Sequence, residues 1–229
     1  MTSKILVFSP YASRPHLTAY EGTIAKGCQV RGANVEYLLC DGLLPECDMH
    51  WDSFCEGSYA RPSDLCQRCQ AGSKAQMDEL LLPYRWLGEF IGLSEKENAF
   101  AWAQSLSAVE MRQAVYMGNP IGNWVQSSIT SYFRQYPPDM SNSRVANVYR
   151  GFLFSASLVA IGLKKYLDQY SIEAALLFNG RQSITRVAFE LFRQREIRVL
   201  THEFPFYLRG HMMVKPNARC WSLEPFNVF

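Results

Sequence analysis

The chain has 229 residues, of which 48% are hydrophobic and 14% aromatic, a composition typical of a globular protein with a buried core. It carries 23 Lys and Arg against 21 Asp and Glu, a formal charge of +2. The strong positive charge typical of nucleic-acid-binding proteins is therefore lacking, and we expect no nucleic-acid partner. The apolar run at residues 5–8 is too short for a signal peptide. Residues 151–163 fall short of the roughly 20 that a membrane span needs. We therefore expect a cytoplasmic protein without a membrane span.

The first 40 residues have the pattern of a strand, a helix and a second strand. Residues 4–8 form a β-branched and aromatic run, residues 16–31 place apolar side chains at helical spacing, and residues 35–39 form another short apolar run. A unit of this kind begins a Rossmann-like, doubly wound parallel sheet. The sequence therefore predicts an α/β fold.

The loop after the first predicted strand contains Arg14 and His16. In a doubly wound sheet this loop borders the crevice in which ligands bind. It lacks the glycine pattern that holds a dinucleotide pyrophosphate, so a nicotinamide or flavin cofactor is not expected.

The segment 40–69 is rich in cysteine, with five of the seven cysteines of the chain and one histidine. Two of them, separated by two residues, have the spacing at which thiolates chelate one tetrahedral ion. In a cytosolic chain metal binding is favoured over disulfides. We expect a loop stapled by structural zinc, with an iron–sulfur cluster or reduced, metal-free cysteines as alternatives. The favoured ligands are Cys40, Cys47, Cys66 and Cys69, with His50 or Cys55 as substitutes.

Residues 70–140 are predicted to be mostly helical and to form a helical insertion, and a long helix over residues 144–169 returns the chain to the sheet. Residues 204–229 contain only a weak strand candidate, at 211–214, and form a tail or the start of a linker. We expect one Rossmann-like domain over residues 1–229, in which the metal loop and the helical insertion are elaborations.

A second strand, helix and strand unit is predicted at residues 174–178, 183–195 and 197–200. A right-handed crossover makes the two strands parallel neighbours, so that their carboxyl ends meet at one edge of the sheet. Polar side chains follow both ends. They are Asn179, Gly180 and Arg181 after the first strand and Thr201, His202 and Glu203 after the second.

Three motifs in this order resemble the N-terminal half of bacterial capsule and surface-polysaccharide glycosyltransferase-like proteins. They are Cys40-Asp41-Gly42-Leu43-Leu44-Pro45-x-Cys47, then Cys66-x2-Cys69, and then Phe178-Asn179-Gly180-Arg181 with Thr201-His202-Glu203. The resemblance implies the GT-B class, in which an N-terminal domain receives the acceptor and a C-terminal domain holds the nucleotide-sugar. A second Rossmann-like domain needs on the order of 150 more residues. The expected partners are a sugar acceptor or nucleotide-sugar, together with a C-terminal donor domain or a second copy of the chain.

The resemblance also suggests roles for individual residues. A general base is needed to deprotonate an acceptor hydroxyl, for which His16 leads and Glu203 and His202 compete. Substrate-binding roles fall to Arg14, Asn179, Gly180 and Arg181. The function expected is that of the acceptor-side domain of a glycosyltransferase, with enzyme activity of this chain alone left open. The alternatives are a non-catalytic glycan- or nucleotide-binding or partner-docking module and an iron–sulfur protein.

Overall fold

The computed structural model describes residues 4–11, 15–51, 64–203 and 213–220. A six-stranded sheet with the order β3-β2-β1-β4-β5-β6 forms its centre. The first five strands are parallel and β6 is antiparallel to β5. The strands are β1 (Lys4–Ser9), β2 (Asn34–Leu39), β3 (Tyr84–Trp86), β4 (Ala174–Phe178), β5 (Arg198–Glu203) and β6 (Met213–Pro216).

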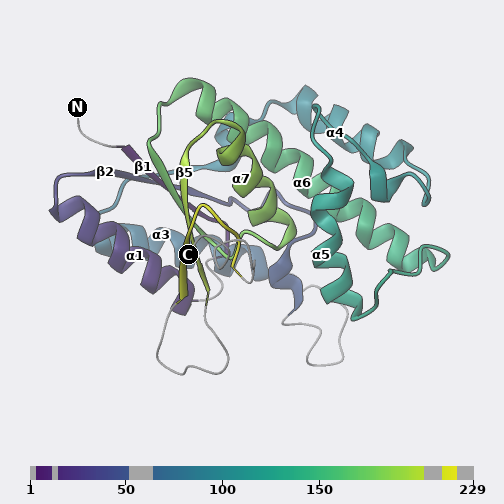
Figure 1. Ribbon diagram of the computed structural model, residues 1–229, viewed down its shortest axis with the longest axis horizontal. Coiled ribbons are helices and arrows are strands. Elements are labelled where there is room, and N and C mark those ends of the chain that lie inside the picture. The colour runs from purple at the N-terminus through teal and green to yellow at the C-terminus, as the bar shows by residue number, and fades with distance from the viewer. Residues whose placement is uncertain (1–3, 12–14, 52–63, 204–212, 221–229) are drawn as a thin grey trace, which may run out of the picture.

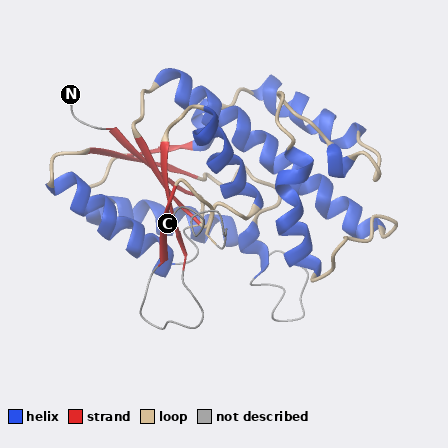
Figure 2. Cartoon of the chain, in the orientation of Figure 1, coloured by secondary structure: helices blue, strands red, loops and turns tan. Residues whose placement is uncertain are grey.

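Helices cover both faces of the sheet, as Figures 1 and 2 show. On one face lie α1 (Pro15–Val30) and α3 (Leu65–Leu80), and on the other lie α5 (Ile121–Phe133), α6 (Ser143–Gln169) and α7 (Ser183–Gln194), with α4 (Leu93–Ser105) packed on α6. Short 3-10 turns are η1 (Asp48–Trp51), η2 (Leu87–Phe90) and η3 (Met111–Gln113).

Alternation along the strands separates two cores. In β1, Val7 packs into the cluster that contains Met77 of α3, whereas Leu6 and Phe8 belong to the larger cluster under α5, α6 and α7. Because successive side chains of a strand point to opposite faces, a run that is apolar at every position is buried on both sides. The predicted α/β class with a parallel, Rossmann-like sheet is thus confirmed.

Helix α6 has 27 residues and is long and apolar enough to cross a membrane by length and composition alone. Within the fold, 72% of its most apolar window is buried. It packs against α4, α5 and α7 and against η2. Its apolar character is therefore accounted for by its place at the centre of one helical layer.

Two details of the sheet differ from the expectation. Tyr84–Trp86 forms the edge strand β3 inside the segment that was expected to be helical, and it pairs with β2. A three-residue strand is too short to show a periodicity of its own. Strand β5 extends to Glu203, so that Thr201, His202 and Glu203 lie in the strand and not beyond it.

A charged network on β2 ties the first three strands to α6. The Glu36 carboxylate accepts from Lys4 Nζ at 3.0 Å and Arg85 Nε at 3.3 Å, and the Tyr166 hydroxyl donates to it. Burial pushes the pKa of Glu36 up, but the hydrogen bonds from Tyr166 and Lys4 outweigh it and leave the pKa below its usual value. The ionised form is therefore the one that the fold stabilises.

Replacing Glu36→Gln should lower the free energy of unfolding by about 1–2 kcal/mol near pH 7, because hydrogen bonds to a charged group are lost. A carboxyl with a lowered folded-state pKa contributes stability above its unfolded pKa and loses it as pH falls through the folded value. The difference from wild type should therefore shrink below about pH 4. Urea denaturation of both proteins at pH values from below about 4 to 7 measures this difference in the free energy of unfolding. The exposed Glu97→Gln control should change stability by less than about 0.5 kcal/mol.

Candidate functional site

Polar residues gather where the carboxyl ends of β1, β4 and β5 meet. In the sheet β1 lies between β2 and β4. Strands β2 and β3 are added on one side of β1, and β4 and β5 on the other. Open α/β sheets bind their ligands at such a point, where the strand order reverses. Ser9 ends β1, Asn179 follows β4, and His202 pairs with Phe178 across the β4–β5 ladder. Ser9 and His202 lie in the sheet and Asn179 directly follows it, so the strand backbones fix where these side chains start.

A chain of hydrogen bonds joins Ser9, Glu21 and His202. The Ser9 hydroxyl donates to Glu21 Oε2, and Glu21 Oε1 lies 2.8 Å from His202 Nε2. Glu21 belongs to α1, so the carboxylate stands between a strand-end hydroxyl on β1 and an imidazole on β5. The three residues are 3%, 2% and 0% exposed. Away from water, a carboxylate depends on its hydrogen-bond partners for stabilisation. The contacts with Ser9 and His202 therefore fix the position of the Glu21 side chain.

The loop after β4 turns sharply at this edge. Asn179 and Gly180 both adopt left-handed backbone conformations, with φ of 63° and 69°. A side chain on Gly180 would be strained by the positive φ, and its Cβ would lie close to its neighbours, 3.2 Å from Thr201 Cγ2 and 3.3 Å from Phe189 Cδ2. The Asn179 side chain donates to Glu203 and accepts from Arg181 N at 2.9 Å. The amide of Asn179 thus holds the turn together.

A second buried carboxylate, Asp48, lies on the other side of the same edge. Its oxygens accept from Tyr11 Oη at 2.7 Å, Ser128 Oγ at 2.5 Å and Ser183 Oγ at 3.2 Å. The Ser128 hydroxyl in turn accepts from Ser183 N at 2.7 Å. The backbone N–H of Ile184, in the first turn of α7, also bonds the carboxylate. Asp48 therefore satisfies the N-terminal end of α7 from a distant loop.

Burial dominates the electrostatics of this cluster. It raises the pKa of Asp48, although the hydrogen bonds from Ser128, Tyr11 and Ser183 act in the opposite direction. Burial likewise raises the pKa of Tyr11 well above its ordinary value, and the neighbouring Asp48 adds to the shift. The Tyr11 hydroxyl consequently stays a proton donor to Asp48 at every physiological pH.

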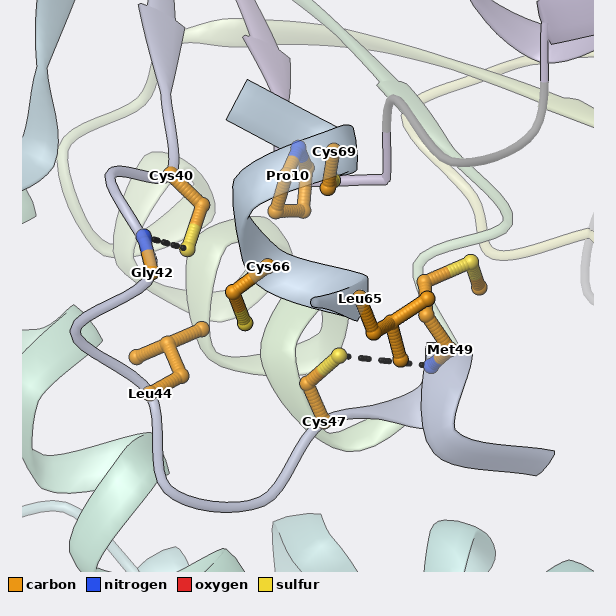
Figure 3. Close-up of a pocket in the computed structure, with 9 residues that line it drawn as sticks. All are labelled: Pro10, Cys40, Gly42, Leu44, Cys47, Met49, Leu65, Cys66 and Cys69. Carbon is orange, nitrogen blue, oxygen red and sulfur yellow. Dashed lines mark hydrogen bonds between the residues drawn. The ribbon is translucent and has the colours of Figure 1, made fainter. Parts of the chain in front are cut away.

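The four favoured cysteines line one cavity, shown in Figure 3. Cys40 and Cys47 come from the loop after β2, and Cys66 and Cys69 extend from α3. The cavity holds about 20 Å³, enough for one water-sized sphere. Cys40 Sγ accepts from Gly42 N at 3.4 Å and Cys47 Sγ from Met49 N at 3.3 Å. The four cysteines singled out from the sequence therefore line the same cavity.

Zinc binding by these cysteines stays a prediction. Among the described residues no three His, Cys, Asp or Glu side chains come close enough together to hold a metal ion. Burial raises the pKa of Cys40 to about 12 and that of Cys47 well above its ordinary value, so both remain thiols near neutral pH. Cys55 lies outside the described residues, as does the side chain of His50. The four cysteines are partly buried side chains grouped around one small cavity.

The structure describes only some of the remaining candidate site residues. His16 lies in the first turn of α1, and its side chain is outside the described part of the structure, as is all of Arg14. His202 and Glu203, within the last residues of β5, lie beside Asn179 and Gly180, which follow β4. His202 and Asn179 are almost completely buried.

Sequence reasoning missed Ser9, Glu21 and Asp48. Glu21 was detectable, because it falls at helical spacing on the same face as Leu17 and Ile24, where an unpaired charge would be costly. Ser9 and Asp48 had no comparable pattern in the sequence.

No protein-family model matches the sequence, and no curated protein matches it. Solved structures do match. A cyclodipeptide synthase from Fluoribacter dumoffii aligns with a TM-score of 0.50 and 12% identity, covering 93% of this chain and 91% of that chain. A cyclo(L-leucyl-L-phenylalanyl) synthase aligns at 0.42 and 11%, covering 93% and 91%. AlbC, a cyclodipeptide synthase from Streptomyces noursei, aligns at 0.36 and 10%, covering 82% and 88%.

The resemblance to glycosyltransferases of the GT-B class is therefore wrong. The structural neighbours are cyclodipeptide synthases, and the alignment with the Fluoribacter enzyme extends over almost the whole of both chains. Roles in capsule polysaccharide synthesis, with sugar acceptors or nucleotide-sugars as partners, lose their basis. The alternatives of a glycan- or nucleotide-binding module and of an iron–sulfur protein are not supported either.

Replacing Asp48→Ala should lower the free energy of unfolding by about 3 kcal/mol, because several buried donors lose their acceptor together. Urea denaturation followed by far-UV circular dichroism measures the change. Asp78→Ala, which removes an exposed carboxylate paired with Lys74, should cost less than about 1 kcal/mol. A loss below about 1 kcal/mol in the Asp48 variant would contradict the anchoring role.

Cys40 should resist alkylation in the folded protein. With a pKa of about 12, its thiolate population at pH 8 is on the order of a thousandfold below that of an ordinary cysteine. Peptide mass spectrometry after iodoacetamide treatment of chelator-treated protein should find Cys40 unmodified, and modified at the ordinary rate after unfolding in urea. Rapid labelling of Cys40 in the folded, chelator-treated protein would show that the thiol is not protected by burial.

Proposed function

We propose that the chain is an acyl-transfer enzyme in which Ser9 carries the acyl group as an ester. The single observation that carries the proposal is the contact between the Ser9 hydroxyl and the Glu21 carboxylate at the end of β1. A serine becomes a useful nucleophile when an adjacent base accepts its proton and a third group orients that base. Glu21 has the position of the base, and His202 on its other oxygen has the position of the orienting group.

In the first step Ser9 Oγ attacks the acyl carbonyl carbon and its proton passes to Glu21. The bond to the leaving group then breaks, and the leaving group takes that proton from Glu21. In the second step an amine attacks the Ser9 ester, an amide bond forms, and the proton released by the amine returns to Ser9 Oγ through Glu21. Glu21 thus acts as base and then as acid in each half of the reaction.

The fold supports this reaction class. A cyclodipeptide synthase, by its name, joins two amino acids in a ring, which requires two aminoacyl groups to reach amine nitrogens. The Fluoribacter enzyme has a similar fold at 12% identity. The substrate class that we propose is accordingly an activated aminoacyl ester or thioester. The fold alone does not decide function, so the proposal depends on the geometry at Ser9.

Access to Ser9 is the structural requirement of this chemistry. Its side chain is 3% exposed, so a substrate reaches the hydroxyl only when the groups that cover it move. The rings of Tyr11 and Phe178 pack edge to face near the same strand ends, with their centroids 6.2 Å apart. A closed site of this kind excludes water, which protects an ester intermediate from hydrolysis.

The purified chain incubated with an amino-acid p-nitrophenyl ester should release a burst of nitrophenolate equal to the enzyme concentration. Its intact mass should rise by one aminoacyl group. Ser9→Ala should show neither, because the atom that carries the ester is gone. Glu21→Gln should slow ester formation by about 10²–10⁴-fold, the usual contribution of a general base.

Ser105→Ala is the matched control, since Ser105 is an exposed hydroxyl at the end of α4, and it should behave as wild type. A covalent adduct that persists in the Ser9 variant would overturn the role of Ser9. Absence of any adduct on the wild-type chain with both ester and thioester donors would overturn acyl transfer itself.

A further inference from the structure

A polar groove lies beside α5, separate from the hydroxyl of Ser9. It holds about 330 Å³, within the range of pockets that take small molecules. Arginines line it from the loop after β4, from α7 and from the segment after β6, and hydroxyl groups line it from α5. These residues are Arg181, Arg186, Arg219, Ser127, Thr130 and Ser131.

Positive charge in the groove is only partly neutralised. Arg186 pairs with Glu190 at 2.7 Å. In the part of the chain that the structure describes, the side chains of Arg181 and Arg219 form no hydrogen bond or ion pair, and no acidic residue lines the groove. Burial lowers the pKa of Arg186, and the positive charge of Arg219 acts in the same direction, against Glu190. Half-buried like charges of this kind repel one another unless an anion lies between them.

Unsatisfied donors point to the same conclusion. Arg181 Nε, Arg186 Nε and Ser127 Oγ are buried atoms without a hydrogen-bond partner. Leaving a buried donor unsatisfied costs about 1–3 kcal/mol, more when the group is charged. Three such donors in one groove therefore indicate that a ligand rich in acceptor oxygens completes it.

We propose that this groove binds the phosphate group of a phosphorylated small molecule. Phosphate has several acceptor oxygens and up to two negative charges, and guanidinium groups bind it through paired N–H donors. The hydroxyls of α5 supply further donors to the same oxygens. Trp124 and Tyr136 also line the groove and offer apolar surface to the rest of the ligand. The inference does not rest on acyl transfer at Ser9, because it concerns equilibrium binding at other residues.

Calorimetry with pyrophosphate as the probe should give a Kd of about 1 mM or tighter for the wild-type chain. The same anion should raise the Tm, since it binds the folded state, while chloride at equal ionic strength should not. Arg181→Gln combined with Arg219→Gln should weaken binding at least about tenfold. The affinity of Arg181→Lys for pyrophosphate should lie between those of the wild type and the double variant. Lysine keeps the positive charge but lacks the paired N–H donors of the guanidinium group.

Arg68→Gln is the matched control, since Arg68 is an exposed arginine on α3 paired with Asp64, and it should bind pyrophosphate as wild type does. Circular dichroism establishes that each variant is folded. No heat and no Tm shift for the wild type up to about 10 mM pyrophosphate, or equal binding by the double variant, would overturn the site. Tighter binding of a single-stranded oligonucleotide than of pyrophosphate would overturn the small-molecule assignment.

Discussion

The buried carboxylate of Asp48 joins parts of the chain that are far apart in sequence. It binds Tyr11 after β1, Ser128 on α5 and Ser183 at the start of α7, so one side chain connects the loop after β2 to three other elements. A carboxylate without water needs such donors, and the donors need it. This mutual requirement ties the loop after β2 to the segment after β1 and to the helical layer at α5 and α7.

The parallel sheet was predictable because its signal is local and repeated. Each of β1, β2 and β4 is a short apolar run that needs burial on both faces, and the helices between them have a single apolar face. The site was predictable only in its location at the strand ends. Its chemistry depends on contacts between distant residues, such as Glu21 with His202, and no pattern within either segment specifies its partner. The cysteines could be grouped from their spacing, but the burial that raises the pKa of the Cys40 and Cys47 thiols is a property of the fold.

The motif that suggested a glycosyltransferase has structural explanations in this fold. Asn179 and Gly180 occupy successive left-handed positions, the amide of Asn179 binds Glu203, and His202 is committed to Glu21. Short motifs at the strand ends of α/β sheets are selected for turn geometry as well as for ligands. Agreement in such residues therefore identifies a place in the fold more securely than it identifies a reaction.

The strand order also has a consequence for how the chain folds during synthesis. The partner of β1 on one side, β2, follows within 40 residues, but its other edge pairs with β4, from Ile5 opposite Ala174 to Phe8 opposite Leu177. Until residues 174–178 emerge, that edge offers unpaired backbone groups to other chains. Because closing so long a loop is slow, this edge of β1 waits longer for its partner than the edge of β2 that pairs with β3.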